Sequence, residues 1–141
     1  MIKFLAPVDG SESAERAVRH LIQLARCKAP AEIHLLNVRE PIDAWEVRRF
    51  MIEEEIAQTQ QAEGESDLRS ARALLDDAGL PYLAQVLIGP VAQTIATFAT
   101  EQGCEAIVMG THGRGGFGNL LMGSVATKVI HLVGIPVTLV R

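Results

Sequence analysis

The residues best suited to chemistry lie in one glycine-rich stretch, residues 110–125, which reads GTHGRGGFGNLLMGSV. An apolar run typical of a strand, residues 106–109, precedes it, and a run with helical spacing, residues 125–132, follows it. A helix N-terminus carries unpaired N–H groups and about half a unit of positive charge. Glycines also let a ligand approach the main chain closely. The stretch is therefore expected to bind phosphate.

The spacing within this stretch is specific. Gly110 is followed after two residues by Gly113, and after nine more by Gly123 and Ser124. We expect the N–H groups of Gly123 and Ser124 to face an anion, with the Ser124 hydroxyl as a further donor. No lysine precedes Ser124, so this is not the common P-loop, and no G-x-G-x-x-G fingerprint follows the first strand. The alternative is a solvated loop whose glycines serve only its turns.

Three further side chains point to the same chemistry. Arg114 and a protonated His112 would supply positive charge from within the loop. Asp9 follows the apolar run 2–8, where open α/β sheets place their ligands. Two roles remain open for Asp9: it caps the next helix, with Glu12 as its capping-box partner, or it contacts a bound base, ribose or metal.

Composition bounds the possible functions. A chain of 141 residues suits a single domain, residues 1–141, and 48 % apolar with only 4 % aromatic residues predicts an aliphatic core. The net charge of −4 and the few aromatic residues argue against nucleic acid as a partner. No segment is long enough for a membrane span, and the N-terminus does not resemble a signal peptide, so we expect a cytoplasmic protein that does not enter membranes.

Strand-like and helix-like runs alternate along the chain, which predicts an α/β fold with a parallel sheet. The expected strands are residues 2–8, 33–38, 82–88, 105–109 and 135–140, and helices are expected over residues 11–27, up to Ala78, 91–103 and 125–133. Right-handed crossovers place helices on both faces of a doubly wound five-stranded sheet. The strand order 3-2-1-4-5 would bring Asp9 and Gly110 into one crevice.

Several residues outside the glycine stretch also carry expectations. Residues 40–66 are the least informative; we expect a loop to about residue 43, then a long helix or a broken pair of helices. Trp45 and Phe50 are expected to pack in the core, with a partner surface or a flap as the alternative. Cys27 and Cys104 are expected to be small buried residues, and His34 to be packed or hydrogen-bonded rather than catalytic.

Four segments together resemble the universal stress protein family: PVDGS at 7–11, IVMGTHGR at 107–114, GSV at 123–125 and PV at 136–137. The glycine spacing resembles that of the ATP-binding branch, G-x2-G-x9-G-[S/T]. The resemblance implies a Rossmann-like sheet and a homodimer, formed through the last strand, residues 136–140. The run of glycines at 115–118 departs from the usual loop.

The resemblance also implies ATP as the ligand, with Mg²⁺ accompanying the phosphates rather than held in a protein cage. Carried over by position, two groups of residues form its site. The base and ribose would lie against Pro7, Asp9, Val38 and Met109, and the phosphates against Gly110, Gly113, Arg114, Gly123, Ser124 and Val125.

The chemistry available beside the phosphates is limited. Phosphoryl transfer needs neutralised charge and a positioned nucleophile, and the sequence offers one nearby carboxylate, Asp9, with no paired acidic cluster. We assign no catalytic or metal-ligating residue and expect a nucleotide-dependent sensor or stress-response regulator with at most slow hydrolysis. Two alternatives remain: a genuine nucleotide hydrolase or phosphotransferase, and a dimeric interaction module with a weak or vestigial nucleotide site.

Overall fold

The computed structural model describes residues 1–27, 30–42, 45, 51–113 and 122–141. Strands and helices alternate along this chain. In order they are β1 (Ile2–Pro7), α1 (Glu12–Cys27), β2 (Ala31–Arg39), α3 (Glu53–Ala78), β3 (Leu83–Ile88), α4 (Val91–Glu101), β4 (Ala106–Gly110), α5 (Ser124–Leu132) and β5 (Val137–Val140). The expected strands and helices are present, with ends that differ by a few residues.

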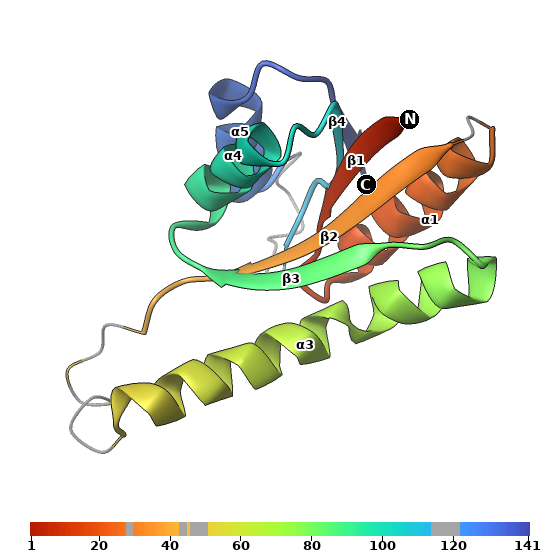
Figure 1. The fold of residues 1–141 in the computed structure, drawn as a ribbon. Helices are drawn as coiled ribbons and strands as arrows, with labels where there is room; N and C mark the ends of the chain where they lie inside the picture. Colours follow the sequence, from red (N-terminus) through yellow and green to blue (C-terminus); the bar gives the residue numbers. More distant parts are fainter. Residues whose placement is uncertain (28–29, 43–44, 46–50, 114–121) are drawn as a thin grey trace.

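The five strands form one parallel sheet in the order β3-β2-β1-β4-β5, as predicted (Figure 1). The chain runs outward from β1 in one direction through β2 and β3, then returns to the other side of β1 for β4 and β5. The switch point therefore lies between β1 and β4, and the carboxyl ends of these two strands open onto a shared crevice.

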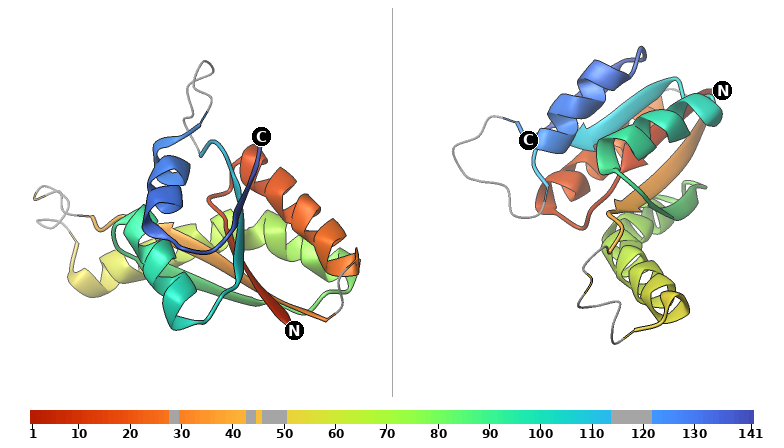
Figure 2. Two further views of the ribbon diagram at one scale, coloured as in Figure 1. Left: turned by 90° about the horizontal axis from the view of Figure 1, so that it is seen from above. Right: turned by 90° about the vertical axis from the view of Figure 1, so that its left-hand side faces the viewer.

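Helices cover both faces of the sheet. Helices α1 and α3 lie on one face, and α4 and α5 lie on the other (Figure 2). Each pair of helices closes its own apolar cluster, which is built mainly from Leu, Ile, Val and Ala with few aromatic residues. The sheet is thus buried on both sides, which is why its central strands read as continuous apolar runs rather than alternating ones.

The helix ends are set by local chemistry. Ser11, not Asp9, caps α1: the Ala14 N–H donates to Ser11 Oγ at 3.2 Å. Of the two roles left open for Asp9, capping with Glu12 is thus not the one observed, because Asp9 accepts the Ser11 N–H two residues on, at 3.0 Å. The C-terminal end of α3 is set by Gly79, whose φ of +70° is the left-handed conformation that favours glycine.

In the region from residue 40, where the sequence says least about structure, residues 53–78 form a long helix. α3 continues unbroken from Glu53 to Ala78 despite Gly64 in its interior. The expectation that Trp45 packs in the core is wrong, since its side chain is 70 % exposed. Phe50, the other aromatic residue of that expectation, lies outside the described residues.

The structure also tests the expectations for the two cysteines and for His34. Cys104 is buried as expected, whereas Cys27 at the end of α1 is exposed. His34 is packed as expected: it is 6 % exposed, its ring meets Phe98 edge to face, and its Nε2 lies 2.9 Å from Glu32 Oε1. Within the described part of the chain, no helix is both long and apolar enough to cross a bilayer.

Candidate functional site

A pocket of about 520 Å³ opens at the carboxyl ends of the central strands, where the switch point predicts a ligand. Nine of the ten residues expected at the nucleotide site line it; they are Pro7, Asp9, Val38, Met109, Gly110, Gly113, Gly123, Ser124 and Val125. Arg114, the tenth, and the glycine run at 115–118 lie outside the described residues. The fold therefore gathers residues from four separate segments of the sequence around one cavity.

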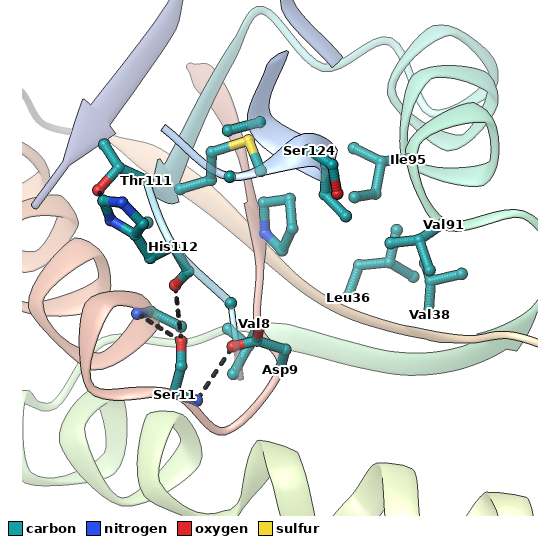
Figure 3. Close-up of a pocket in the computed structure, with 18 residues that line it drawn as sticks. Val8, Asp9, Ser11, Leu36, Val38, Val91, Ile95, Thr111, His112 and Ser124 are labelled. Carbon is teal, nitrogen blue, oxygen red and sulfur yellow. Dashed lines mark hydrogen bonds between the residues drawn. The ribbon is translucent and has the colours of Figure 1, made fainter. Parts of the chain in front are cut away.

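One half of the pocket is apolar. Leu36 and Val38 from β2 meet Val91 and Ile95 from α4 on this side (Figure 3). Met109 at the end of β4 also contributes to the lining. A flat, largely apolar ring system suits such a wall, because ligand pockets combine apolar linings with a few placed polar groups.

The N-terminus of α5 provides a polar side. The first intrahelical bond runs from the Thr127 N–H to the Gly123 carbonyl at 3.1 Å, so the N–H groups of residues 124–126 precede the helical ladder. The expectation that the Gly123 N–H faces an anion is wrong, because this group donates to the Thr111 carbonyl at 2.6 Å. The donors suited to a phosphate therefore begin at Ser124.

Asp9 and Gly113, which both line the pocket, lie close together. A Cβ atom built on Gly113 would be 2.6 Å from Asp9 Oδ2, which is closer than any normal contact. The other carboxylate oxygen, Oδ1, accepts the Ser11 N–H (Figure 3). The turn after β1 and the loop after β4 thus meet at this carboxylate, and a glycine is needed at 113 for the approach.

Gly110 serves a different purpose from Gly113, although both line the pocket. A Cβ atom on Gly110 would lie 2.7 Å from the Ser13 carbonyl carbon and 2.9 Å from the Ala14 nitrogen. Both are main-chain atoms of α1, which cannot move away without shifting the helix. Gly110 therefore allows α1 to pack closely on the end of β4.

Hydroxyl groups hold Thr111 and His112, the first residues after β4. Ser13 Oγ donates to the Val140 carbonyl at 3.0 Å and accepts the His112 N–H at 3.5 Å. Thr111 Oγ1 lies 2.9 Å from His112 Nδ1, and Ser11 Oγ reaches the His112 carbonyl at 3.4 Å. These contacts orient residues 111–113, and His112 itself is one of the residues that line the pocket.

Carboxylate side chains are scarce among the described residues that line the pocket. Among the lining residues that the structure describes, Asp9 is the one carboxylate. Across the described ranges, no three His, Cys, Asp or Glu side chains gather into a group suited to a metal ion.

Sequence reasoning missed part of the lining. Val8, Ser11, Ala14, Leu36, Val91, Ile95, Thr111 and Ala126 also face the pocket. Leu36 and Val38 share one face of β2, because side chains alternate along a strand, so the choice of Val38 already pointed to Leu36. Val91 and Ile95 come from the first turns of α4, and no sequence signal placed that helix at the site.

The match to a family model decides the evolutionary relationship. The model described as "Universal stress protein family" matches residues 1–141. The chain belongs to the universal stress protein family. A member from Thermus aquaticus is 32 % identical over 97 % of this chain and 96 % of its own. Universal stress protein MJ0577 of Methanocaldococcus jannaschii is 28 % identical over 99 % of this chain and 94 % of its own.

Solved structures of universal stress proteins share the fold. The MJ0577 structure superposes with a TM-score of 0.85 at 30 % identity, over 99 % of this chain and 94 % of that one. The Archaeoglobus fulgidus protein in complex with dAMP gives 0.69 at 23 % identity, over 100 % and 98 % of the two chains. An Arabidopsis thaliana family member with AMP bound gives 0.70 at 18 % identity, over 99 % and 91 %.

Proposed function

We propose that this universal stress protein binds an adenine nucleotide in the pocket between β1 and β4 and acts as a nucleotide-dependent regulator. The observation that carries the proposal is the pairing of an apolar wall with the N-terminus of α5 in one cavity. The base would lie against Val38 and Met109, and the phosphates at Ser124 and Val125. Two structures with the same fold, described as bound to dAMP and AMP, support the choice of an adenine nucleotide.

ATP is our proposed ligand, accompanied by Mg²⁺. The support is the glycine spacing 110-113-123, which resembles the ATP-binding branch of the family, and a helix N-terminus that favours added negative charge. Arg114 would add a cationic contact to the outer phosphates. Gly113 and Gly123 would let the main chain lie close to the phosphates, and Gly110 would contribute through the close packing of α1 on β4.

Calorimetric titration tests the proposal. Nucleotide-free protein would be titrated with Mg-ATP, AMP and adenosine, and the same titrations repeated with Gly123→Val and Gly134→Val. A Cβ on Gly123 would lie 3.0 Å from the Thr111 carbonyl oxygen, whereas one on Gly134 would meet nothing within 4 Å. We expect ATP to bind more tightly than AMP, and AMP more tightly than adenosine.

The two glycine variants give the sharper comparison. Gly123→Val should weaken ATP binding at least about tenfold, or about 1.4 kcal/mol, while Gly134→Val, past the other end of α5, should bind as the wild type does. Folded wild-type protein that binds none of the three ligands would contradict the proposal. Equal binding by both variants would show that the N-terminus of α5 does not hold the phosphates.

We further propose that hydrolysis is at most slow. Asp9 is the one carboxylate among the described lining residues, and efficient phosphoryl transfer needs a positioned nucleophile together with neutralised charge. Phosphate release from ATP would be measured with the wild type and with Arg114→Ala. Fast turnover that Arg114→Ala abolishes would contradict this part of the proposal and favour a genuine hydrolase.

A homodimer through β5 is the proposed assembly. β5 forms one edge of the sheet (Figure 2), and the carbonyl groups of Pro136 and Val140 accept hydrogen bonds from the β4 side. Main-chain groups alternate in direction along a strand, so the N–H groups of Val137 and Leu139 face the open edge. A second copy would satisfy them by pairing there.

A further inference from the structure

We propose that Asn37 is a positioning residue for the nucleotide pocket, because its side-chain amide holds the main chain of the Asp9 turn in place and ties it to Asp67 of α3. Asn37 does not touch the cavity itself, so the inference rests on the proposed nucleotide function. The side chain is 1 % exposed. Its Nδ2 donates to the Val8 carbonyl at 2.8 Å and to Asp67 Oδ2 at 3.3 Å.

The Val8 carbonyl lies at the point where β1 leaves the sheet. The Val8 N–H still pairs with the Leu36 carbonyl of β2 at 2.8 Å. The chain then turns away through Gly10, whose φ is +82°. The Asn37 side chain supplies the next hydrogen bond in place of the β2 main chain. The Val8 carbonyl and the Asp9 nitrogen belong to one planar peptide unit, so this bond fixes the plane from which the Asp9 side chain starts.

α3 supplies a buried charge to the same network. Asp67 is 5 % exposed. Its Oδ2 accepts from Arg39 Nη1 at 3.0 Å as well as from Asn37, and Arg39 Nη2 lies 2.7 Å from Glu63 Oε2. A buried carboxylate is costly unless it is paired and hydrogen-bonded. The surrounding cluster is aliphatic, so an apolar side chain at this position would attach α3 to the sheet at a lower free-energy cost than a buried carboxylate does.

Gly64 shows that α3 is shaped to bring Asp67 to this position. A Cβ atom at 64 would lie 2.5 Å from Val86 Cγ1 and 2.9 Å from Asn37 Oδ1. A glycine inside a helix costs about 1 kcal/mol relative to alanine, so a glycine here is explained by the close approach of α3 to β2 and β3. One turn further along α3, Asp67 then reaches Asn37.

Two explanations of the network make different predictions. If it only attaches α3 to the sheet, loss of Asn37 lowers stability and leaves any effect on binding independent of Asp9. If it positions the Asp9 turn, loss of Asn37 weakens binding through Asp9. A double-mutant cycle separates these cases, because coupling energy appears only between residues that act together.

The cycle uses wild type, Asn37→Ala, Asp9→Ala and the double variant, with Mg-ATP affinity measured by calorimetry. We expect Asn37→Ala to weaken binding about tenfold when Asp9 is present, and less than about twofold when it is absent. Leu75→Val, which trims a fully buried side chain of α3 outside the pocket lining, serves as the control and should bind as the wild type. Equal weakening in both Asp9 backgrounds would overturn the proposal.

A measurement without ligand keeps the inference separate from the proposed function. Amide chemical shifts and hydrogen exchange of residues 9–11 would be compared in wild type, Asn37→Ala and Leu75→Val. We expect changes at these amides only in Asn37→Ala; unchanged amides would overturn the proposal whatever ATP does. If the amides respond but wild type binds no nucleotide, the proposed function fails and the link from Asn37 to the Asp9 turn stands. Should Asn37→Ala not fold, Asp67→Asn is used instead and is expected to alter the same amides.

Discussion

Replacing Gly113 with alanine separates binding from folding. In the structure the new Cβ would lie 2.6 Å from Asp9 Oδ2, the end of a short side chain. Ordinary contact needs roughly 1 Å more, so the Asp9 carboxylate must rotate away and give up its bond to the Ser11 N–H. We expect the free energy of unfolding to fall by no more than about 1 kcal/mol, while Asp9 leaves its place in the pocket.

The effect on binding follows from the group that moves. A hydrogen bond to a charged group contributes about 1.5–3 kcal/mol, so Gly113→Ala should weaken ATP binding roughly 10- to 100-fold. Calorimetric titration measures this loss, and urea unfolding measures the small change in stability. Gly134→Ala is the matched control, because a Cβ there meets nothing within 4 Å. Wild-type affinity in Gly113→Ala would refute a role for Asp9 in the site.

Gly110→Ala gives the opposite pattern. Its Cβ would meet main-chain atoms of α1, namely the Ser13 carbonyl carbon at 2.7 Å and the Ala14 nitrogen at 2.9 Å. Main-chain atoms cannot rotate away, so we expect a loss of about 1–3 kcal/mol in the free energy of unfolding. A Gly110→Ala variant as stable as Gly113→Ala would show that the close packing of α1 on β4 has been misjudged.

Four further predictions concern other parts of the molecule. Gly64→Ala should lower the free energy of unfolding by about 1–3 kcal/mol, because its Cβ would lie 2.5 Å from Val86 Cγ1; a more stable variant in urea would refute the close contact. In native protein a thiol reagent should modify Cys27 and not Cys104. Burial raises the pKa of the Cys104 thiol in the folded protein. As pH rises, this thiol therefore loses its proton in the unfolded chain before it does so in the folded protein, and the free energy of unfolding should fall above about pH 8.5. A similar fall in Cys104→Ala would show that Cys104 is not its cause. Leu139→Pro, which removes an N–H from the open edge of β5, should convert a dimer to a monomer in light scattering, and an unchanged mass would place the interface elsewhere.

The strand order and the gathering of the pocket residues could be predicted because they depend on strong local signals. Alternation of strand-like and helix-like runs fixes a parallel sheet, and the handedness of crossovers restricts its order. The predicted end of a helix at Ala78 is confirmed, and the φ of +70° at Gly79 explains why a glycine follows it. The carboxyl ends of β1 and β4 then bring Asp9 and Gly113 together.

Contacts that depend on three-dimensional approach could not be read from the sequence. Both Asp9 and Ser11 are suitable helix caps, and only the observed turn decides in favour of Ser11. Gly64 reads as a weak point in a polar helix until the packing of α3 on Asn37 is seen. Trp45 is apolar and aromatic, so burial was the natural expectation, yet it is 70 % exposed.

The central claim is that an adenine nucleotide lies between the turn after β1 and the N-terminus of α5. An amide NMR titration of isotopically labelled protein with Mg-ATP tests it most directly, because it locates the ligand without any substitution. We predict saturable shifts at Asp9, Gly113 and residues 124–126, with smaller shifts at Val38 and none at Gly79. Saturable shifts confined to the β5 edge, or no shifts at ATP concentrations up to several millimolar, would contradict the account.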